Sequence, residues 1–241
     1  MAQYPVESHI FATQHCSLIA VGTVSPIYAI DSHFVIKRRP KPSDDFACQA
    51  YNIEIRAYER LGDHPQVAKV REVTADGIII ERGECLRQKI QSSESTIETK
   101  LRWTQEAAAG HVKYIDFSGS GIDGEAAMVC YEWCSYRPGS EPNIKTDIFA
   151  FGSTLFEIET GEKPYQELEK TLGTGKLMRV VEQLFATGKY PRVDMLVLGD
   201  IILRCWNGDY HSMDEVSRDI DACCQGIYDT GAVSIPSSRR S

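Results

Sequence analysis

The chain has 241 residues, of which 42% are hydrophobic, 25% charged and 9% aromatic. This composition is typical of a folded globular protein and excludes collagen-like, coiled-coil and wholly disordered chains. The 26 Lys and Arg residues against 34 Asp and Glu residues give a net charge of −8, which argues against nucleic acid as a partner because phosphate backbones attract basic surfaces.

The sequence also predicts the compartment. No apolar run approaches the ~20 residues that cross a bilayer, so we expect no membrane partner. The first fifteen residues lack the basic start and apolar segment of a secretory signal. The eight cysteines include no CxxC pair, which suits neither a zinc site nor a disulfide scaffold. We therefore expect an intracellular protein, cytoplasmic or nuclear, with reduced cysteines.

The first third of the chain predicts a small antiparallel sheet with one helix. Short apolar runs are separated by Gly, Pro, Asp and Ser, which is typical of strands joined by turns. The runs cover residues 17–21, 27–30, 34–36, 67–70 and 77–80. A helical segment between the third and fourth runs opens at residues 43–45 and stops before Gly62. The expected order is three strands, a helix and two strands.

After Glu84 the pattern becomes helical. Residues 95–110 predict one helix, and residues 212–224 predict another that a capping box opens. Residues 147–160 carry apolar side chains on more than one face, so we expect this helix to be buried in the core. Residues 229–241 have little apolar content and predict a flexible tail.

Several segments carry a resemblance to a known family. HFVIK places Lys37 on a strand, and IEIRAYERL places Glu54 on the following helix. VKYIDFSGS at residues 112–120, KTDIFAFGSTLFEIETGEKPY at 145–165 and LGDIILRCWNGDYHSMDEV at 198–216 then follow in order. Together they resemble the eukaryotic protein kinase family, and the sequences of these segments are closest to those of Ser/Thr kinase-like proteins of fungi.

The resemblance implies an α+β, two-lobed protein-kinase-like fold with an internal truncation. It would cover residues 1–228, with a small antiparallel-sheet N-lobe over about 1–82 and a mostly helical C-lobe over about 83–228. The segment at residues 112–120 would be a strand followed by the family's DFG motif, and the helix at 147–160 would be the central helix of the C-lobe.

The resemblance also implies a site for ATP and Mg²⁺. In the family, a strand lysine holds the α- and β-phosphates and a helix carboxylate fixes that lysine; Lys37 and Glu54 match these positions. Asp116 matches the aspartate that binds magnesium. Gly22 and Ile27 stand in the stretch AVGTVSPI, which aligns with the glycine-rich loop over the nucleotide.

Each of these assignments has a structural alternative. Lys37 and Glu54 could form an ordinary solvated ion pair. Gly22 could belong to a simple hairpin turn. An isolated Asp116 at a strand end could cap a turn.

The chain departs from the family at the phosphate-binding elements. Ala20 and Ser25 stand where the outer glycines of the loop would be, and Pro26 removes one amide donor. Ser118 replaces the glycine of DFG, and Gly119 follows it. We therefore expect weakened nucleotide binding.

The family's catalytic loop, HRDLxxxxN, is missing. None of the six histidines is followed two residues later by Asp, and none of the three asparagines is preceded by Asp five residues upstream. Only 31 residues separate Glu84 from Asp116, whereas the family's two helices, three strands and catalytic motif require roughly 40. The sequence therefore predicts a truncation near Gly110 and His111 and assigns no catalytic residue.

These features favour a pseudokinase that acts as a binding or regulatory module for a protein partner. The first alternative is an active ATP-dependent Ser/Thr kinase with a protein substrate, although it lacks the general base. The second alternative is an incomplete product that does not fold, because the truncation would leave the helix at residues 147–160 without partners.

Overall fold

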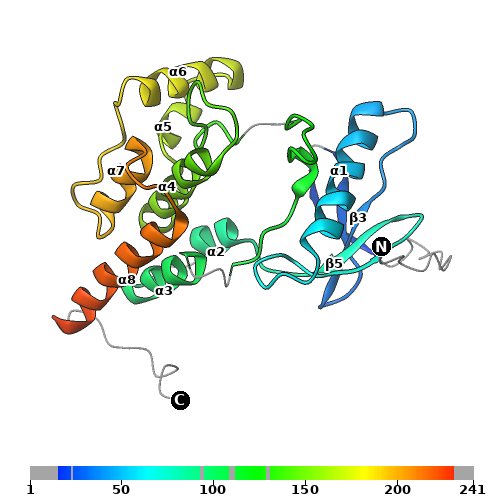
Figure 1. The fold of residues 1–241 in the computed structure, drawn as a ribbon, viewed down its shortest axis with the longest axis horizontal. Coiled ribbons are helices and arrows are strands. Elements are labelled where there is room, and N and C mark those ends of the chain that lie inside the picture. The colour runs from blue at the N-terminus through cyan, green and yellow to red at the C-terminus, as the bar shows by residue number, and fades with distance from the viewer. Residues whose placement is uncertain (1–15, 23, 93–94, 109–111, 129–130, 231–241) are drawn as a thin grey trace. The chain divides into compact units, whose positions relative to one another are not determined.

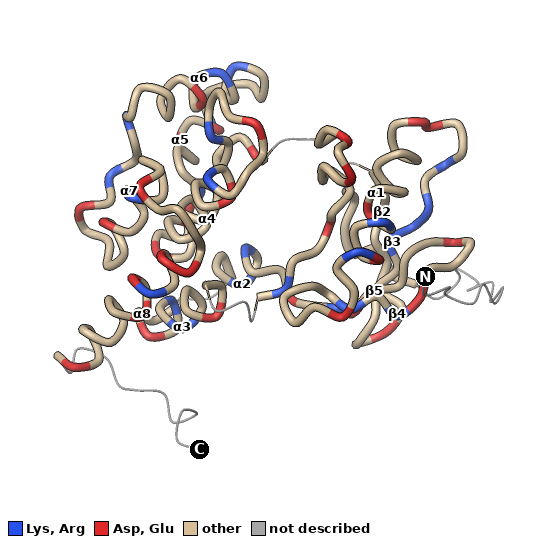
Figure 2. The backbone as a smooth tube through the Cα atoms, viewed as in Figure 1, with Lys and Arg blue, Asp and Glu red and all other residues tan. Residues whose placement is uncertain are grey.

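The computed structural model describes residues 16–22, 24–92, 95–108, 112–128 and 131–230 (Figure 1). They form two compact units. The sheet unit comprises residues 16–84 and 112–128, and the helical unit comprises residues 85–108 and 131–230. The protein has the expected α+β class, with a small antiparallel sheet and a mostly helical remainder. Charged residues of both signs are distributed over both units (Figure 2).

The sheet unit contains a five-stranded sheet in the order β1-β2-β3-β5-β4. All neighbouring strands are antiparallel. The strands are β1 (Ser17–Val21), β2 (Pro26–Ala29), β3 (Phe34–Arg38), β4 (Val70–Val73) and β5 (Gly77–Glu81). The predicted order of three strands, a helix and two strands is confirmed.

The fourth strand was predicted too early, at residues 67–70. In the structure β4 begins only at Val70, because the preceding backbone pairs with a distant segment. Val67 forms a parallel bridge with Tyr114, and the Ala68 N–H donates to the Tyr114 carbonyl at 3.1 Å. The segment at 112–120, predicted to be a strand, forms only this bridge and the short 3₁₀ helix η2 (Phe117–Gly119). It belongs to the sheet unit, although the sequence-based division placed it in the helical lobe.

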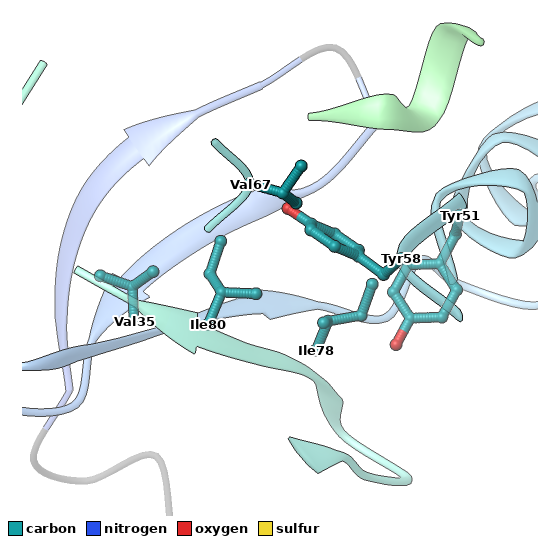
Figure 3. Close-up of a cluster of buried hydrophobic side chains, with 6 residues drawn as sticks. All are labelled: Val35, Tyr51, Tyr58, Val67, Ile78 and Ile80. Carbon is teal, nitrogen blue, oxygen red and sulfur yellow. The ribbon is translucent and has the colours of Figure 1, made fainter. Parts of the chain in front are cut away.

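Helix α1 (Asp45–Leu61) covers the core of this unit. The Asp44 side chain accepts the Ala47 N–H at 3.0 Å, which caps the start of the helix, and Gly62 ends it at φ +59°. Tyrosines of α1 meet the aliphatic side chains of the strands in one buried cluster (Figure 3). Its members are Val35, Tyr51, Tyr58, Val67, Ile78 and Ile80.

The helical unit consists of seven α-helices within the described residues. They are α2 (Leu86–Ser92), α3 (Ile97–Ala108), α4 (Ile144–Thr160), α5 (Gln166–Glu169), α6 (Thr174–Ala186), α7 (Gly199–Asn207) and α8 (Met213–Asp229). The three helices predicted for this region correspond to α3, α4 and α8. Asp229 still belongs to α8, and residues 231–241 of the predicted tail lie outside the described residues.

Helix α4 is the centre of this unit. Ile148, Leu155 and Ile158 have no exposed surface, and α2, α3 and α7 pack around the helix. The expectation that a truncated chain would leave this helix without partners is therefore wrong for the structure, since neighbouring helices cover it. Gly152 allows the closest approach, because a Cβ there would lie only 2.6 Å from Cβ of Cys205 on α7.

None of the helices in the described part of the chain combines the length and apolar character that a membrane span requires. The predicted truncation point at Gly110 and His111 lies outside the described residues.

Candidate functional site

Lys37 lies on β3 and projects from the core-facing side of the sheet. Side chains alternate along a strand, so Lys37 shares a face with Val35, which belongs to the buried cluster. In the sheet register Lys37 lies opposite Ile27 on β2 and Ile78 on β5. Its side chain is only 5% exposed. A buried ammonium needs anionic partners, and the structure supplies two.

The first partner is Glu54 on α1. Tyr51, Glu54 and Tyr58 are spaced three and four residues apart, so they share one face of the helix, and that face packs against the sheet. Oε2 of Glu54 lies 2.7 Å from Nζ of Lys37, and the Glu54 side chain is 1% exposed. Burial raises the pKa of Glu54, because it disfavours the charged form more than the nearby Lys37 favours it.

The second partner is Asp116, immediately before η2. Its Oδ1 accepts a hydrogen bond from Lys37 Nζ at 2.6 Å and another from Ser118 Oγ at 2.7 Å. Burial alone would raise the pKa of Asp116, but the hydrogen bonds from Lys37 and Ser118 lower it below the usual value. Unlike Lys37, the Asp116 side chain is 59% exposed, so solvent and ligands can reach it.

The backbone at Asp116 is strained, and the turn that follows it is held by a ring contact. Asp116 adopts a left-handed conformation, with φ +64° and ψ +67°, which costs free energy for a residue other than glycine. The Phe117 ring packs edge-on against Tyr58 of α1, with ring centroids 5.2 Å apart. The same helix therefore positions Glu54 and, through Tyr58, the turn that carries Asp116.

A second group of charges attaches the following loop to α1. Arg56 donates to Glu125 at 2.9 Å and to Asp123 at 3.0 Å, and Arg60 also donates to Asp123. Asp123 and Gly124 both have positive φ, at +54° and +85°, and form the tight turn that presents these carboxylates. Sequence reasoning missed this cluster. Its signal was the spacing of Arg56 and Arg60 four residues apart on one helix face.

The predicted glycine-loop residues take different roles. The Gly22 N–H donates to the Ser25 carbonyl at 3.1 Å, as in a hairpin turn, so this amide is already used within the chain. Residue 23 lies outside the described residues. Ile27 packs against the buried cluster beside Lys37. The structure thus brings Lys37, Glu54, Asp116 and Ile27 together but does not present the Gly22 amide to a ligand.

The residues present fit part of a metal–nucleotide complex. Lys37 carries an ammonium, a group that can contact phosphate oxygens. Asp116 supplies one exposed carboxylate, and proteins commonly bind Mg²⁺ through one or two carboxylates together with substrate phosphates and water. Among the described residues no three His, Cys, Asp or Glu side chains gather into a metal-holding group.

Asp147 in the helical unit has a partner within that unit. The Tyr131 hydroxyl donates to Oδ1 of Asp147 and lies 3.1 Å from Oγ1 of Thr146. Burial and the Asp147 contact raise the pKa of Tyr131 to about 12. This contact joins the segment at Tyr131 to the first turn of α4.

No model of a known protein family matches this chain, and no curated protein matches it either. The candidate site is therefore defined by its own residues, the group formed by Lys37, Glu54 and Asp116.

Proposed function

We propose that this chain is a protein-kinase-like pseudokinase that binds ATP with Mg²⁺ and acts as a binding or regulatory module for a protein partner. The observation that carries the proposal is the position of Lys37 Nζ, 2.7 Å from Glu54 Oε2 and 2.6 Å from Asp116 Oδ1. Three residues from separate parts of the chain meet at one point, in the arrangement that the motif resemblance implies.

Stability alone does not explain this arrangement. Buried ion pairs contribute little net stability, because desolvation offsets much of the attraction, and apolar replacements are often as stable. Asp116 adds the cost of a left-handed backbone. Strained or buried charged groups of this kind cluster at functional sites, which supports a ligand-binding role.

Each residue has a distinct role in the proposed site. Lys37 would contact the phosphates, and Glu54 would hold the flexible lysine side chain in place. Asp116 would hold the metal ion, which supplies charge neutralisation for the phosphates when bound. Ile27 would contact the nucleotide beside Lys37. The cradle is weakened, because the Gly22 amide is engaged by Ser25.

Phosphoryl transfer is not part of the proposal. The sequence lacks the HRDLxxxxN motif, whose aspartate accepts the proton of the acceptor hydroxyl, and general-base catalysis is typically worth ~10² to 10⁴ in rate. The protein would therefore act through the surface that it presents to a protein partner and not through turnover.

A thermal-shift titration tests the nucleotide site, because a ligand that binds the native state raises the unfolding midpoint. We expect ATP with Mg²⁺ to raise the midpoint of the wild-type protein. Asp116→Asn should reduce the gain that Mg²⁺ gives, and Lys37→Met should abolish the shift. Lys69→Met is the matched control, since Lys69 is a 60% exposed lysine of the same unit.

Two results would contradict the proposal. One is an unchanged midpoint in millimolar ATP with Mg²⁺. The other is transfer of labelled phosphate to a protein acceptor that disappears in Lys37→Met, which would identify an active kinase.

A further inference from the structure

The two edge strands of the sheet, β1 and β4, differ in charge. β4 carries Arg71 and Glu72, and the Arg71 guanidinium lies over the Phe34 ring, 4.5 Å from its centre. β1 has the sequence SLIAV, without a charged residue or a proline, and all five of its residues are exposed. Charged side chains and prolines commonly protect an edge strand from pairing with another chain. β1 has neither form of protection.

The outer side of β1 offers backbone groups to a further strand. Within the described residues β1 pairs only with β2, and no backbone group of β1 is hydrogen-bonded outside that ladder. A register shift between Leu18 and Ala20, as in a β-bulge, bends this edge, but it adds no charge that would repel a partner. An edge of this kind binds an extended segment by adding it to the sheet through main-chain hydrogen bonds.

The side chains of β1 favour an apolar occupant. Three of its five residues are large and apolar with substantial exposed surface: Leu18, Ile19 and Val21. A strand paired with β1 that carries apolar side chains removes this surface from water, which is favourable. A charged strand would instead lose hydration without gaining an ionic partner on β1.

We propose that β1 is a self-association edge, at which two copies of this chain pair their β1 strands antiparallel. The strand is self-complementary in this orientation. A two-fold axis at Ile19 places this residue opposite its own copy. Leu18 then faces Ala20, and Ser17 faces Val21. No like charges meet across this pairing, although each copy carries a net charge of −8. The pairing does not depend on nucleotide binding.

The dimer should be weak, because two five-residue strands bury only a small area. Sedimentation equilibrium of the full chain measures it. We expect the mean mass of the wild-type protein to rise toward twice that of the monomer between roughly 10 and 500 µM, as for a small interface. Added salt should strengthen the dimer, because screening reduces the repulsion between two acidic chains.

Ile19→Lys tests the edge directly. This variant should remain monomeric over the same range, because two lysines would face each other at the axis. Ile97→Lys is the matched control, since Ile97 on α3 is 47% exposed and Ile19 is 45% exposed. The control should associate like the wild-type protein. Equal association of wild type and Ile19→Lys would overturn the inference, as would loss of association in both variants.

Hydrogen exchange shows which strand is covered. In the wild-type protein the amides of residues 18–21 should exchange about threefold more slowly at the highest concentration than at the lowest, because protection follows the dimer fraction. In Ile19→Lys their exchange should not depend on concentration. Strong protection at every wild-type concentration would show that the same chain covers the edge, and fast exchange at every concentration would show that the edge stays free. Either result would overturn the inference.

Discussion

Two buried glutamates, one in each unit, are neutralised in different ways. In the helical unit Glu157 of α4 receives a two-pronged contact from Arg87, with Nε 2.5 Å from Oε1 and Nη2 2.9 Å from Oε2. In the sheet unit Glu54 of α1 receives one ammonium, Lys37, which it shares with Asp116. Both glutamates are almost completely buried.

The contact of Glu157 with Arg87 has the geometry of a structural ion pair. The guanidinium group of Arg87 donates to both oxygens of Glu157 in fixed geometry, so both oxygens already have a hydrogen-bond partner. Glu54 Oε2 makes no well-directed hydrogen bond. In the proposed site Lys37 would exchange its contact with Asp116 for a phosphate and keep Glu54 as its partner. Displacing Arg87 from Glu157 would break two hydrogen bonds at once.

The two units also differ in what fills their cores. In the helical unit a group of aromatic rings surrounds Trp206, whose Nε1 donates to Ser153 Oγ at 3.1 Å. In the sheet unit the aliphatic side chains of the strands meet two tyrosines and the Lys37 group. Charge is therefore part of the core in the sheet unit, which makes its stability depend on pH.

The largest expected effect concerns the aromatic core. Trp206→Ala should destabilise the helical unit by about 4 kcal/mol, because it removes a large buried side chain and leaves a cavity. All three tryptophans of the chain lie in this unit, so the fluorescence of the remaining Trp103 and Trp133 follows its unfolding in urea. Hydrogen exchange in β3 and α1 should change little; equal loss of protection there would show that the two units unfold together.

The next effect concerns the charged core of the sheet unit. Lys37→Met should destabilise this unit by about 3 kcal/mol, because two carboxylates lose their shared cation. Hydrogen exchange of α1 and β3 amides measures the loss. Adding Glu54→Gln should restore part of the stability, since it removes one uncompensated buried charge. A double variant as unstable as the single one would show that the lysine acts through packing.

A smaller effect separates charge from geometry in the helical unit. Arg87→Lys should cost about 1.5 kcal/mol, because lysine keeps the charge but cannot make the two-pronged contact with Glu157. Tryptophan fluorescence in urea measures it. The control is Arg102→Lys, since Arg102 is an exposed arginine of the same unit, and it should be nearly silent. Comparable losses in both variants would show that the two-pronged contact with Glu157 adds no stability.

The smallest effect is a pH dependence of the sheet unit. The pKa of Glu54 is raised above 4.5 in the folded protein, so Glu54 binds protons more strongly there than in the unfolded chain. Its contribution is fully present below pH 4.5 and is lost as pH rises through the raised pKa. Glu54→Gln should remove this decline.

The pH dependence is measured as the urea concentration at which amides of the sheet unit lose half of their protection from hydrogen exchange, at several pH values between 4.5 and 7.5. Three aspartates of the same unit have pKa values below 3.8 and therefore titrate below this pH range; they are Asp31, Asp116 and Asp123. An equal decline in wild type and Glu54→Gln would assign the pH dependence to another group.

The sequence predicts the order of elements well, because strand runs and helix caps are local signals. The position of β4 escaped it, since the backbone of Val67 and Ala68 pairs with Tyr114, a contact between residues far apart in the chain. The burial of α4 was predicted correctly from its apolar faces, but its coverage by α2, α3 and α7 depends on tertiary packing.

The candidate site was predictable only in part. Motif spacing predicts Lys37, Glu54 and Asp116 as site residues. The contacts among them become visible only in the folded structure. Ser118 was noted as a departure from a motif, and its hydrogen bond to Asp116 follows from a left-handed backbone that sequence does not reveal. The use of the Gly22 amide within its own turn is likewise a three-dimensional fact.

The close approach of α4 and α7 at Gly152 has a practical consequence for Cys205. This thiol has no exposed surface, and burial raises its pKa to about 12, so it is neither accessible nor ionised in the folded state. An alkylating reagent can react with it only after the two helices separate. The rate of Cys205 alkylation therefore reports how often the helical unit opens between α4 and α7.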